Sequence, residues 1–420
     1  MANFRDSFHS WLYAPFFWLA SCLACHQTTE QPVVAQSATS QAEKVPALYS
    51  LPKELPEWSD TETNPQLDGR TVTIIPAIQN QVQRFIRNGG NPIAAMVMVN
   101  VKTGEIIAIA QGKSPSEWGA ETHSALHNGF PSASLFKTIT AAAGFEVAEL
   151  DPDISLSMFG GCSHVNPRGI WPPAESSRPD QGLTLRKAYG HSCNGFFAKM
   201  AVNQIGLGPI LTMAKKLGWN GTTIASDFAL NPSPLREPNP SSSSIHTIGK
   251  FAAGFGSVGL SAVHAAWQYS LIANDGMAMP VHIFKKSNWT TAKDQEKVRA
   301  IEAETAVNLR KIMDATVLSG TATSAFSKGR LKVLKPNVGG KTGTLNGTNP
   351  QGLTTWFAGL YPIEDPEIAV AAVVMLHDLW HFKATNLAAA SILAYSDYKS
   401  NISEMPRTAR KISEGADKKQ

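Results

Sequence analysis

Charge is sparse in this sequence, and lysine and arginine form no cluster before the tail that follows Met405. Only 17% of the 420 residues are charged, and the formal net charge is +4. Nucleic-acid binding relies on concentrated positive charge, so we expect no nucleic-acid partner. The 43% of hydrophobic residues suffice for one large catalytic unit or two ordinary domains, and we find no internal repeat.

The apolar run near the N-terminus is short for a membrane span. It extends from Trp11 to Cys25, which is 15 residues, whereas a spanning helix needs about 20. This length suits the core of an export signal, to which we assign residues 1–25. Leu19-Ala20-Ser21-Cys22 also resembles a bacterial lipoprotein signal, in which Cys22 is lipidated and becomes the mature N-terminus.

Three alternatives for this segment stay open: lipidation at Cys25 instead, an ordinary cleaved signal, or an uncleaved anchor. All of them place the folded part on the periplasmic, extracytoplasmic face. A lipid or an uncleaved anchor would also hold the protein at the membrane.

Cysteine is nearly absent from the rest of the chain. Only Cys162 and Cys193 follow the signal segment. Two cysteines in an exported protein can form a disulfide. Two buried free thiols fit the sequence equally well, so both states stay open.

The remaining chain divides into a tether, one folded domain and a tail. Residues 26–70 are rich in Gln, Thr, Ser, Pro and Glu without helical or alternating periodicity, which predicts a flexible tether. Residues 71–400 carry the periodic patterns of helices and strands and form the domain. Residues 401–420 are charged, and we expect them to be disordered.

The domain is expected to have strands near both ends and mostly helices between them. The expected helices cover residues 77–87, 134–150, 196–205, 210–217, 262–273, 303–316 and 384–395, with another that starts at Thr184. The expected strands cover residues 93–101, 106–110, 338–345, 353–361 and 367–376. Their connections are short enough for hairpins, which indicates antiparallel pairing. We therefore expect an α+β fold: an antiparallel sheet flanked by helices, beside a mainly helical lobe, with the active site in the cleft between them.

Ser134 and Lys137 are three positions apart at the start of an apolar helix, so they share one face. A serine becomes a good nucleophile when a neighbouring base takes its proton. Lysine, with an ordinary pKa of about 10.4, can act as that base when burial lowers its pKa. The same spacing occurs at Ser50–Lys53, in a proline-containing linker, and at Ser396–Lys399, near the end of the last helix. We interpret both as coincidence.

Two further motifs follow in the chain. Ser192-Cys193-Asn194 is the one Ser-x-Asn sequence, and Lys341-Thr342-Gly343-Thr344 lies in an expected strand after two glycines. Glycines in a strand permit close approach of a ligand to the backbone. A second Lys-Thr-Gly, which starts at Lys102, lies in a hairpin turn, where its glycine suits a positive φ. We interpret that copy as structural.

The three motifs, in this order, resemble those of class A β-lactamases and penicillin-binding transpeptidases. The resemblance to the transpeptidases covers roughly residues 71–395 and includes Gly320-Thr321-Ala322 and Trp356-Phe357-Ala358-Gly359. It implies a serine acyltransferase, a D,D-transpeptidase, that acts on D-Ala-D-Ala stem peptides of peptidoglycan. It also implies β-lactam antibiotics as covalent inhibitors, and neither a metal nor a cofactor.

The chemistry of acyl transfer assigns each motif residue a role. Ser134 would attack the carbonyl, with Lys137 as its base. Ser192 would pass a proton to the leaving amine. Asn194 would hold Lys137 and the amide backbone of the substrate. Lys341 would lower the pKa of Lys137 and attract an anionic substrate.

By the same resemblance, Thr342, Gly343 and Thr344 would bind the substrate, with the two threonines on its carboxylate. The backbone N–H groups of Ser134 and Thr344 would form the oxyanion hole. Simpler interpretations exist for several residues. Ser192 and Asn194 can cap a helix, and Thr344 can be an ordinary strand residue. Lys187 and His191 suit a surface better than catalysis, and His377 and His381, four apart, lack an evident third metal ligand.

The acceptor of the acyl group can be an amine or water. A class A β-lactamase needs a deacylating glutamate, and Glu237 lacks the Glu-x-x-Leu-Asn pattern expected around it. The second and third motifs are also far apart, as in transpeptidases. We therefore favour transfer to an amine over a D,D-carboxypeptidase or a β-lactamase. A penicillin sensor or scaffold that is acylated without turnover is the alternative from another class.

Overall fold

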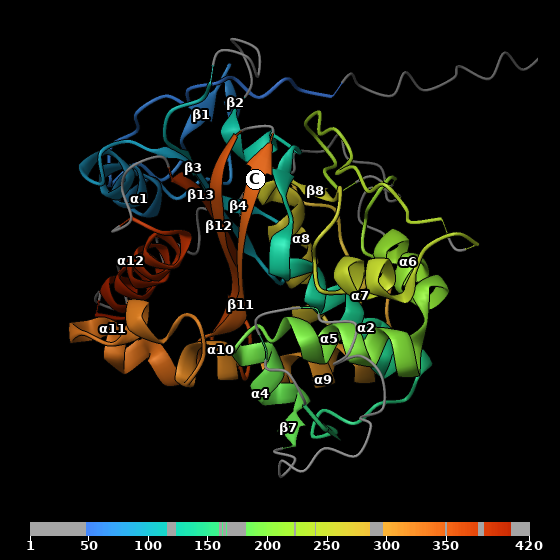
Figure 1. The fold of residues 1–420 in the computed structure, drawn as a ribbon. Coiled ribbons are helices and arrows are strands. Elements are labelled where there is room, and N and C mark those ends of the chain that lie inside the picture. The colour runs from blue at the N-terminus through green and yellow to red at the C-terminus, as the bar shows by residue number, and fades with distance from the viewer. Residues whose placement is uncertain are drawn as a thin grey trace, which may run out of the picture. The chain divides into compact units, whose positions relative to one another are not determined.

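Five antiparallel strands form the framework of the protein (Figure 1). The computed structural model describes residues 48–115, 123–158, 162, 165, 182–221, 224–239, 241–285, 297–348, 351–376 and 382–404. The strands are β3 (Ile93–Asn100), β4 (Ile106–Gln111), β11 (Gly339–Thr348), β12 (Gln351–Tyr361) and β13 (Ile368–Leu376). They lie in the order β11-β12-β13-β3-β4, and every neighbouring pair is antiparallel. The predicted pairing is confirmed.

Both faces of the sheet are buried. Successive side chains of a strand point to opposite faces, so each central strand contributes to two hydrophobic cores. In β13, Ala371 and Val373 belong to one core, whereas Ala372 and Val374 belong to the other. All nine residues of β13 are buried, which explains its uninterrupted apolar sequence.

Helices α1 (Pro76–Asn88) and α12 (Ala384–Glu404) cover one face of the sheet (Figure 1). Helix α1 starts with Pro76 at a position that needs no backbone donor. Its buried Ile78, Val82 and Ile86 recur every four residues and form one apolar stripe. These two helices therefore support the sheet on the face that points away from the helical lobe.

Helix α8 (Ala262–Ala273) covers the opposite face and is buried along nearly its whole length. Its N-cap is Ser261, whose side chain accepts a hydrogen bond from the backbone N–H of His264. The other helices of this lobe are α2 (Lys137–Val147), α4 (Leu185–Gly190), α5 (Asn194–Met200), α6 (Leu207–Lys216), α7 (Ile245–Ala252), α9 (Ala303–Met313) and α10 (Ala315–Leu318). The predicted α+β architecture, with a helical lobe beside a sheet flanked by helices, is confirmed.

The short elements complete the chain. The short helices are η2 (Ser124–Leu126), η3 (Ala133–Phe136), the π-helix η4 (Ala201–Ile205), η6 (Thr323–Phe326), α11 (Gly329–Leu334) and η7 (Lys335–Asn337). The two-residue strands are β1 (Gln66–Leu67), β2 (Arg70–Thr71), β5 (Phe130–Pro131), β6 (Ser155–Leu156), β7 (Leu183–Thr184), β8 (Gly259–Leu260), β9 (Met277–Ala278) and β10 (Val298–Arg299).

The connectivity explains how distant motifs meet. The chain leaves the sheet after β4, builds the helical lobe, and returns at β11, while β13 pairs with β3. Strand β11 therefore lies at the edge of the sheet, and glycine Gly343 in it lies against Ala133 of η3.

The predicted tether is wrong in its C-terminal half. Leu51, Trp58 and Leu67 are buried in the main core, and the indole N–H of Trp58 donates to the carbonyl oxygen of Gln66 at 3.1 Å. These scattered apolar residues lack periodicity because they anchor an irregular segment. The signal segment 1–25 and residues 26–47 lie outside the described residues. The last helix continues into the predicted tail as far as Glu404, and residues 405–420 also lie outside the described chain.

Candidate active site

Ser134 lies on a tight turn and not on the α-helix that we predicted. It belongs to the 3₁₀ turn η3, and helix α2 begins only at Lys137. Residues i and i+3 eclipse each other in a 3₁₀ turn. The Nζ atom of Lys137 is accordingly 2.7 Å from the Oγ atom of Ser134. The turn brings the predicted nucleophile and its predicted base into direct contact.

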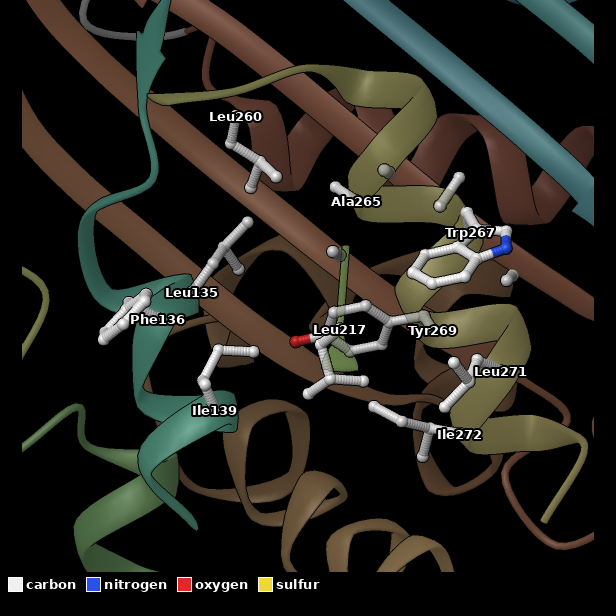
Figure 2. Close-up of a cluster of buried hydrophobic side chains, with 14 of the residues drawn as sticks. Leu135, Phe136, Ile139, Leu217, Leu260, Ala265, Trp267, Tyr269, Leu271 and Ile272 are labelled. Carbon is white, nitrogen blue, oxygen red and sulfur yellow. The ribbon is translucent and has the colours of Figure 1, made fainter. Parts of the chain in front are cut away.

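The turn is anchored in the core on its apolar side. Leu135 and Ile139 face the buried side chains of α8, among them Tyr269 (Figure 2). The Phe136 ring packs instead against the rings of Trp219 and Phe251. The Thr138 hydroxyl is within hydrogen-bond distance of the Tyr269 hydroxyl, at 3.2 Å, and of the Tyr189 hydroxyl, at 2.8 Å. This packing fixes the helix that carries Lys137.

Lys137 is fully buried. Burial lowers the pKa of its amine well below the ordinary value, and the charge of Lys341 lowers it further. The effect that we predicted for Lys341 is therefore present, although burial is the larger cause. A lowered pKa increases the neutral fraction of the amine at neutral pH, and only the neutral amine can accept a proton.

Three oxygen atoms surround the Lys137 amine. Besides Ser134 Oγ, they are Oδ1 of Asn194 at 2.7 Å and the carbonyl oxygen of Ala253 at 2.6 Å. The last two are acceptors only, whereas a neutral amine has two N–H bonds and one lone pair. When both N–H bonds point to these acceptors, the lone pair faces the Ser134 hydroxyl. The arrangement suits removal of a proton from Ser134.

The second motif lies between two short helices. Thr184 caps α4 through its side chain, and Ser192 then adopts a φ of 57°, which turns the chain into α5 at Asn194. No side chain caps α5, so the amide of Asn194 serves Lys137 and not the helix end. The Ser192 side chain is partly buried and makes no hydrogen bond to Ser134 or Lys137 within the described chain.

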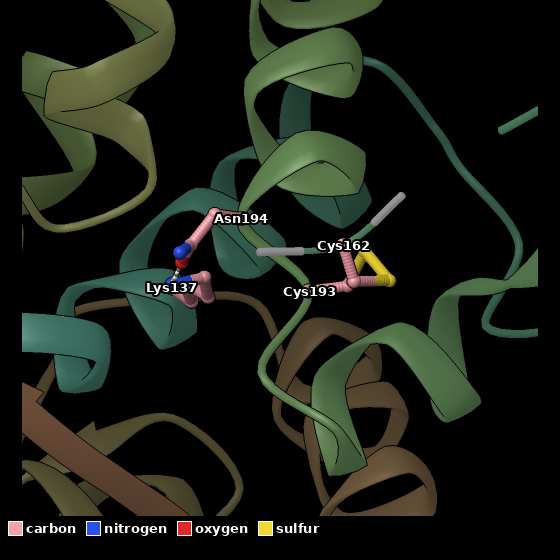
Figure 3. The surroundings of a disulfide bond; sticks show 4 residues. All are labelled: Lys137, Cys162, Cys193 and Asn194. Carbon is pink, nitrogen blue, oxygen red and sulfur yellow. Dashed lines mark hydrogen bonds between the residues drawn. A yellow bond between two sulfur atoms is a disulfide. The ribbon is translucent and has the colours of Figure 1, made fainter. Parts of the chain in front are cut away.

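Cys162 and Cys193 form a disulfide, with their Cα atoms 4.4 Å apart (Figure 3). This decides between the two states that the sequence left open. Cys193 is the central residue of the second motif, and Asn194 points from the next position to Lys137 (Figure 3).

The third motif lies on β11 beside the turn η3 that carries Ser134. Lys341 is fully buried, and its Nζ atom donates to the carbonyl oxygen of Thr342 at 2.9 Å. Burial lowers the pKa of Lys341 to about 7. Its amine also lies 5.5 Å from the ring centroid of Tyr189, within range of a cation–π contact. The site thus contains two lysine amines whose pKa values are both lowered by burial.

The two threonines of the motif differ in exposure. Thr344 is exposed, whereas Thr342 is buried and its hydroxyl is hydrogen-bonded to the Thr321 hydroxyl. Thr321 also bonds to the carbonyl oxygen of Gly190, through its backbone N–H at 3.1 Å and its hydroxyl at 3.3 Å. Thr321 therefore connects α4, which precedes the second motif, to the third.

Two contacts of the site were not predicted from the sequence. The contact between the Ala253 carbonyl oxygen and Lys137 could not be predicted, because no pattern of side chains in the sequence indicates it. Thr321 was part of the resemblance, but nothing in the sequence indicated its contact with Thr342. The glycine that follows Ala253 was a weak hint: Gly254 has a φ of 91°, and a Cβ atom there would lie 2.1 Å from the carbonyl oxygen of Ala133.

The remaining sequence candidates lie apart from these contacts. Lys187 and His191 are exposed, and Glu237 forms an ion pair with Lys215 at 2.9 Å. Cys22, His377 and His381 lie outside the described residues. Within the described chain, none of the helices is both long and apolar enough to cross a membrane.

Similarity to known proteins agrees with this geometry. Residues 94–395 match the model of the penicillin binding protein transpeptidase domain. The chain is 26% identical to penicillin-binding protein PbpB of Mycolicibacterium smegmatis over 358 residues, which are 73% of this chain and 51% of that protein. It is 23% identical to the peptidoglycan D,D-transpeptidase PbpA of the same species over 365 residues, which are 75% of this chain and 68% of that protein. The chain thus spans about half the length of the first relative.

A solved structure shares the fold. Penicillin-binding protein A from Mycobacterium tuberculosis, in its imipenem acyl-enzyme complex, superposes with a TM-score of 0.62 at 21% sequence identity. The match covers 78% of this chain and 79% of that one. With the family model matched over most of the sheet and the whole helical lobe, the chain belongs to the family of penicillin-binding protein transpeptidase domains.

Proposed function

We propose that this protein is a serine D,D-transpeptidase that cross-links peptidoglycan stem peptides through an acyl-enzyme. The observation that carries the proposal is the 2.7 Å contact between Ser134 Oγ and the Nζ atom of Lys137, a buried lysine whose pKa is lowered. Family membership and the name of the relative PbpA, a peptidoglycan D,D-transpeptidase, support the same reaction.

In the acylation step, Lys137 would take the proton of Ser134 while Oγ attacks the carbonyl carbon of the penultimate D-alanine. The backbone N–H groups of Ser134 and Thr344 would stabilise the oxyanion. As the amide bond breaks, Ser192 would pass the proton taken by Lys137 on to the nitrogen of the terminal D-alanine, which leaves as the free amino acid. A β-lactam would acylate Ser134 by the same step, but its leaving nitrogen stays attached.

In the second step, an amine from a neighbouring stem peptide would attack the ester on Ser134. Ser192 would accept the proton that the attacking amine loses, and Lys137 would return a proton to Ser134 Oγ, which is released as the alcohol. The two residues would thus transfer protons in the reverse order of the first step.

The charge of the site suits an anionic substrate. Lys137 and Lys341 are buried, and neither forms an ion pair with an acidic side chain in the described chain. A substrate carboxylate would supply the missing negative charge. We propose that Thr344, the exposed threonine, binds this carboxylate at the edge formed by Thr342 and Gly343, with Lys341 beneath it.

We further propose that the protein is exported and held at the outer face of the membrane. Lipidation of Cys22 would anchor it, and residues 26–47 would form the tether between the lipid and the folded domain. Labelling cells with a clickable palmitate analogue tests the anchor: the wild-type protein should be labelled, and Cys22→Ala should not. Equal labelling of both would contradict lipidation at Cys22, and labelling of neither would contradict a lipid anchor.

One experiment tests the reaction. The full-length protein is incubated with a fluorescent penicillin and, separately, with a D-Ala-D-Ala peptide plus an amine acceptor. A persistent adduct together with the aminolysis product supports the proposal. Rapid loss of the label would indicate a β-lactamase, and release of D-alanine without aminolysis a carboxypeptidase. An adduct without peptide turnover would indicate a sensor.

A further inference from the structure

The disulfide lies next to the catalytic contacts in sequence and in space. Cys193 is fully buried and directly precedes Asn194, whose Oδ1 atom accepts from Lys137 at 2.7 Å. Its partner, Cys162, is partly exposed and lies 31 positions earlier. Figure 3 shows the disulfide on one side of this segment and the Asn194–Lys137 contact on the other.

Cys162 also holds the start of α5 through its backbone. Its carbonyl oxygen accepts from the backbone N–H of Asn194 at 2.8 Å and from that of Gly195 at 3.4 Å. The first N–H groups of a helix have no partner within the helix, and no side chain caps α5. Cys162 therefore takes the place of the missing cap, and the disulfide keeps its carbonyl group there.

The turn that precedes Asn194 needs such support. Ser192 has a φ of 57°, a left-handed conformation that is unfavourable for a residue other than glycine. A turn of this kind persists only where the surroundings hold it. The covalent bond at Cys193 and the two hydrogen bonds to Cys162 are contacts of that kind.

We propose that the Cys162–Cys193 disulfide positions Asn194 against the Lys137 amine, so that cleavage of the disulfide slows acylation of Ser134 in a protein that stays folded. Cys162 is thus a positioning residue, since it acts through Asn194. The inference rests on the proposed acyl-transfer function. On this proposal, the rate of acylation depends on whether thiols in the surroundings reduce the disulfide or leave it oxidised.

The cleaving reagent would be a dithiol. One of its thiolates attacks the Sγ atom of the partly exposed Cys162, and Cys193 leaves as a thiolate that takes up a proton. The second thiol of the reagent then displaces Cys162 and closes into a disulfide. The protein gains two electrons and two protons, and the reagent is oxidised.

The surroundings of Lys137 predict how its titration responds. The charge of Lys341 on β11 acts on the Lys137 amine. The amine is in direct contact with Asn194 and with the carbonyl oxygen of Ala253. The neighbouring Thr138 is within hydrogen-bond distance of the hydroxyls of Tyr189 and Tyr269. Burial is the largest cause of the lowered pKa. When α5 loosens and water reaches the amine, the pKa of Lys137 should rise.

The test compares the full-length protein in the oxidised, reduced and reoxidised states. The rate constant for acylation by a fluorescent penicillin is measured against pH, at a temperature where circular dichroism shows both states folded. We expect acylation to be slower on the order of 10²-fold after reduction, the magnitude typical of a misplaced catalytic group. Its rise with pH should move to higher pH, and reoxidation should restore both. Cys162→Ser should behave like the reduced protein with or without reductant.

A double variant, Cys162→Ser with Cys193→Ser, controls for effects of the dithiol elsewhere, because the reagent should not change its acylation rate. Equal rates and pH profiles for the folded oxidised and reduced protein would overturn the inference. If neither state is acylated, the proposed function fails. The inference is then decided by ¹⁵N NMR titration of the Lys137 amine: a higher pKa after reduction supports it, and an unchanged pKa overturns it.

Discussion

The side chains of Asn194 and Lys137 meet at 2.7 Å although 57 positions separate them in the chain. Asn194 offers only its oxygen to the amine, so it binds Lys137 without adding charge. A neutral partner leaves the pKa of Lys137 low, whereas a carboxylate would raise it. An asparagine at this position therefore suits the role that we propose for Lys137, that of a base.

Replacing Asn194 by aspartate tests this relationship. A negative charge beside Lys137 favours its protonated form, so the pKa of Lys137 should rise and less neutral amine should exist at neutral pH. We expect the rate of acylation by penicillin at neutral pH to fall about 10-fold or more for each unit of that rise. The pH at which the rate is half-maximal should move upward.

Asn203→Asp is the matched control, because Asn203 is exposed on the helical segment that follows. It adds the same charge away from the amine and should leave the profile unchanged. A profile of Asn194→Asp that coincides with that of the wild type would show that Lys137 is not the titrating base.

Lys137→Met removes the proposed base while it keeps most of the side-chain volume. Positioned proton transfer contributes about 10²- to 10⁴-fold to catalysis, so acylation should slow by that factor. Lys199→Met is the control, since Lys199 is also buried and donates instead to the carbonyl oxygen of Ser157 at 2.8 Å. Stopped-flow measurement with a fluorescent penicillin distinguishes the two. Equal rates for both variants would remove Lys137 from the mechanism.

Gly254→Ala should disturb the turn that carries the proposed nucleophile, Ser134. The added Cβ atom would lie 2.1 Å from the carbonyl oxygen of Ala133, and the φ of 91° at Gly254 disfavours any side chain. We expect a loss of about 1–3 kcal/mol in the free energy of unfolding, together with slower acylation of the protein that remains folded.

Gly208→Ala is the contrasting change. Gly208 lies in α6 with no atom within 4 Å of its added Cβ atom, and alanine favours a helix by about 1 kcal/mol. This variant should be as stable as the wild type or more so, with unchanged acylation. Urea unfolding and penicillin acylation measure both effects, and an intact acylation rate in Gly254→Ala would contradict the role of this contact.

Lys341→Met should change how stability depends on pH. The pKa of Lys341 is about 7 in the folded protein and near 10.5 when unfolded, so the unfolded state binds more protons between these values. Stability therefore rises with pH across this window. Below it, the buried charge costs the folded protein free energy, and Lys341→Met should be more stable by a few kcal/mol, at about 1.4 kcal/mol for each pKa unit.

That gain should shrink as the pH approaches about 10. Urea unfolding of both proteins at pH values below and above this window measures the difference. A gain that is the same at every pH would show that Lys341 is charged with its ordinary pKa.

Much of the fold was predictable because its signals are local. The stripe of Ile78, Val82 and Ile86 predicted α1, and the apolar run from Ile368 to Leu376 predicted β13. The helix expected over residues 262–273 is α8. The order of the three motifs predicted that Lys137, Asn194 and the Lys341 strand would converge, and the structure brings them together.

What the sequence did not reveal depends on contacts between distant backbone groups. The carbonyl oxygen of Ala253 bonds to Lys137 across 116 positions, and no side-chain pattern encodes it. The segment around Trp58 is anchored in the core by a few apolar residues that are isolated in the sequence. Its composition, without periodicity, therefore led to the prediction of a tether. The disulfide between Cys162 and Cys193 could not be predicted with certainty, because the spacing of the two cysteines in the chain does not give the distance between them in space.

The most direct measurement is peptide mapping of the protein after reaction with a β-lactam. We predict that mass spectrometry finds one equivalent of the acyl group on the peptide that contains Ser134. The folded Ser134→Ala protein should form no adduct. An adduct on another residue, or one that persists in Ser134→Ala, would contradict the assignment of Ser134 as the nucleophile on which the three motifs converge.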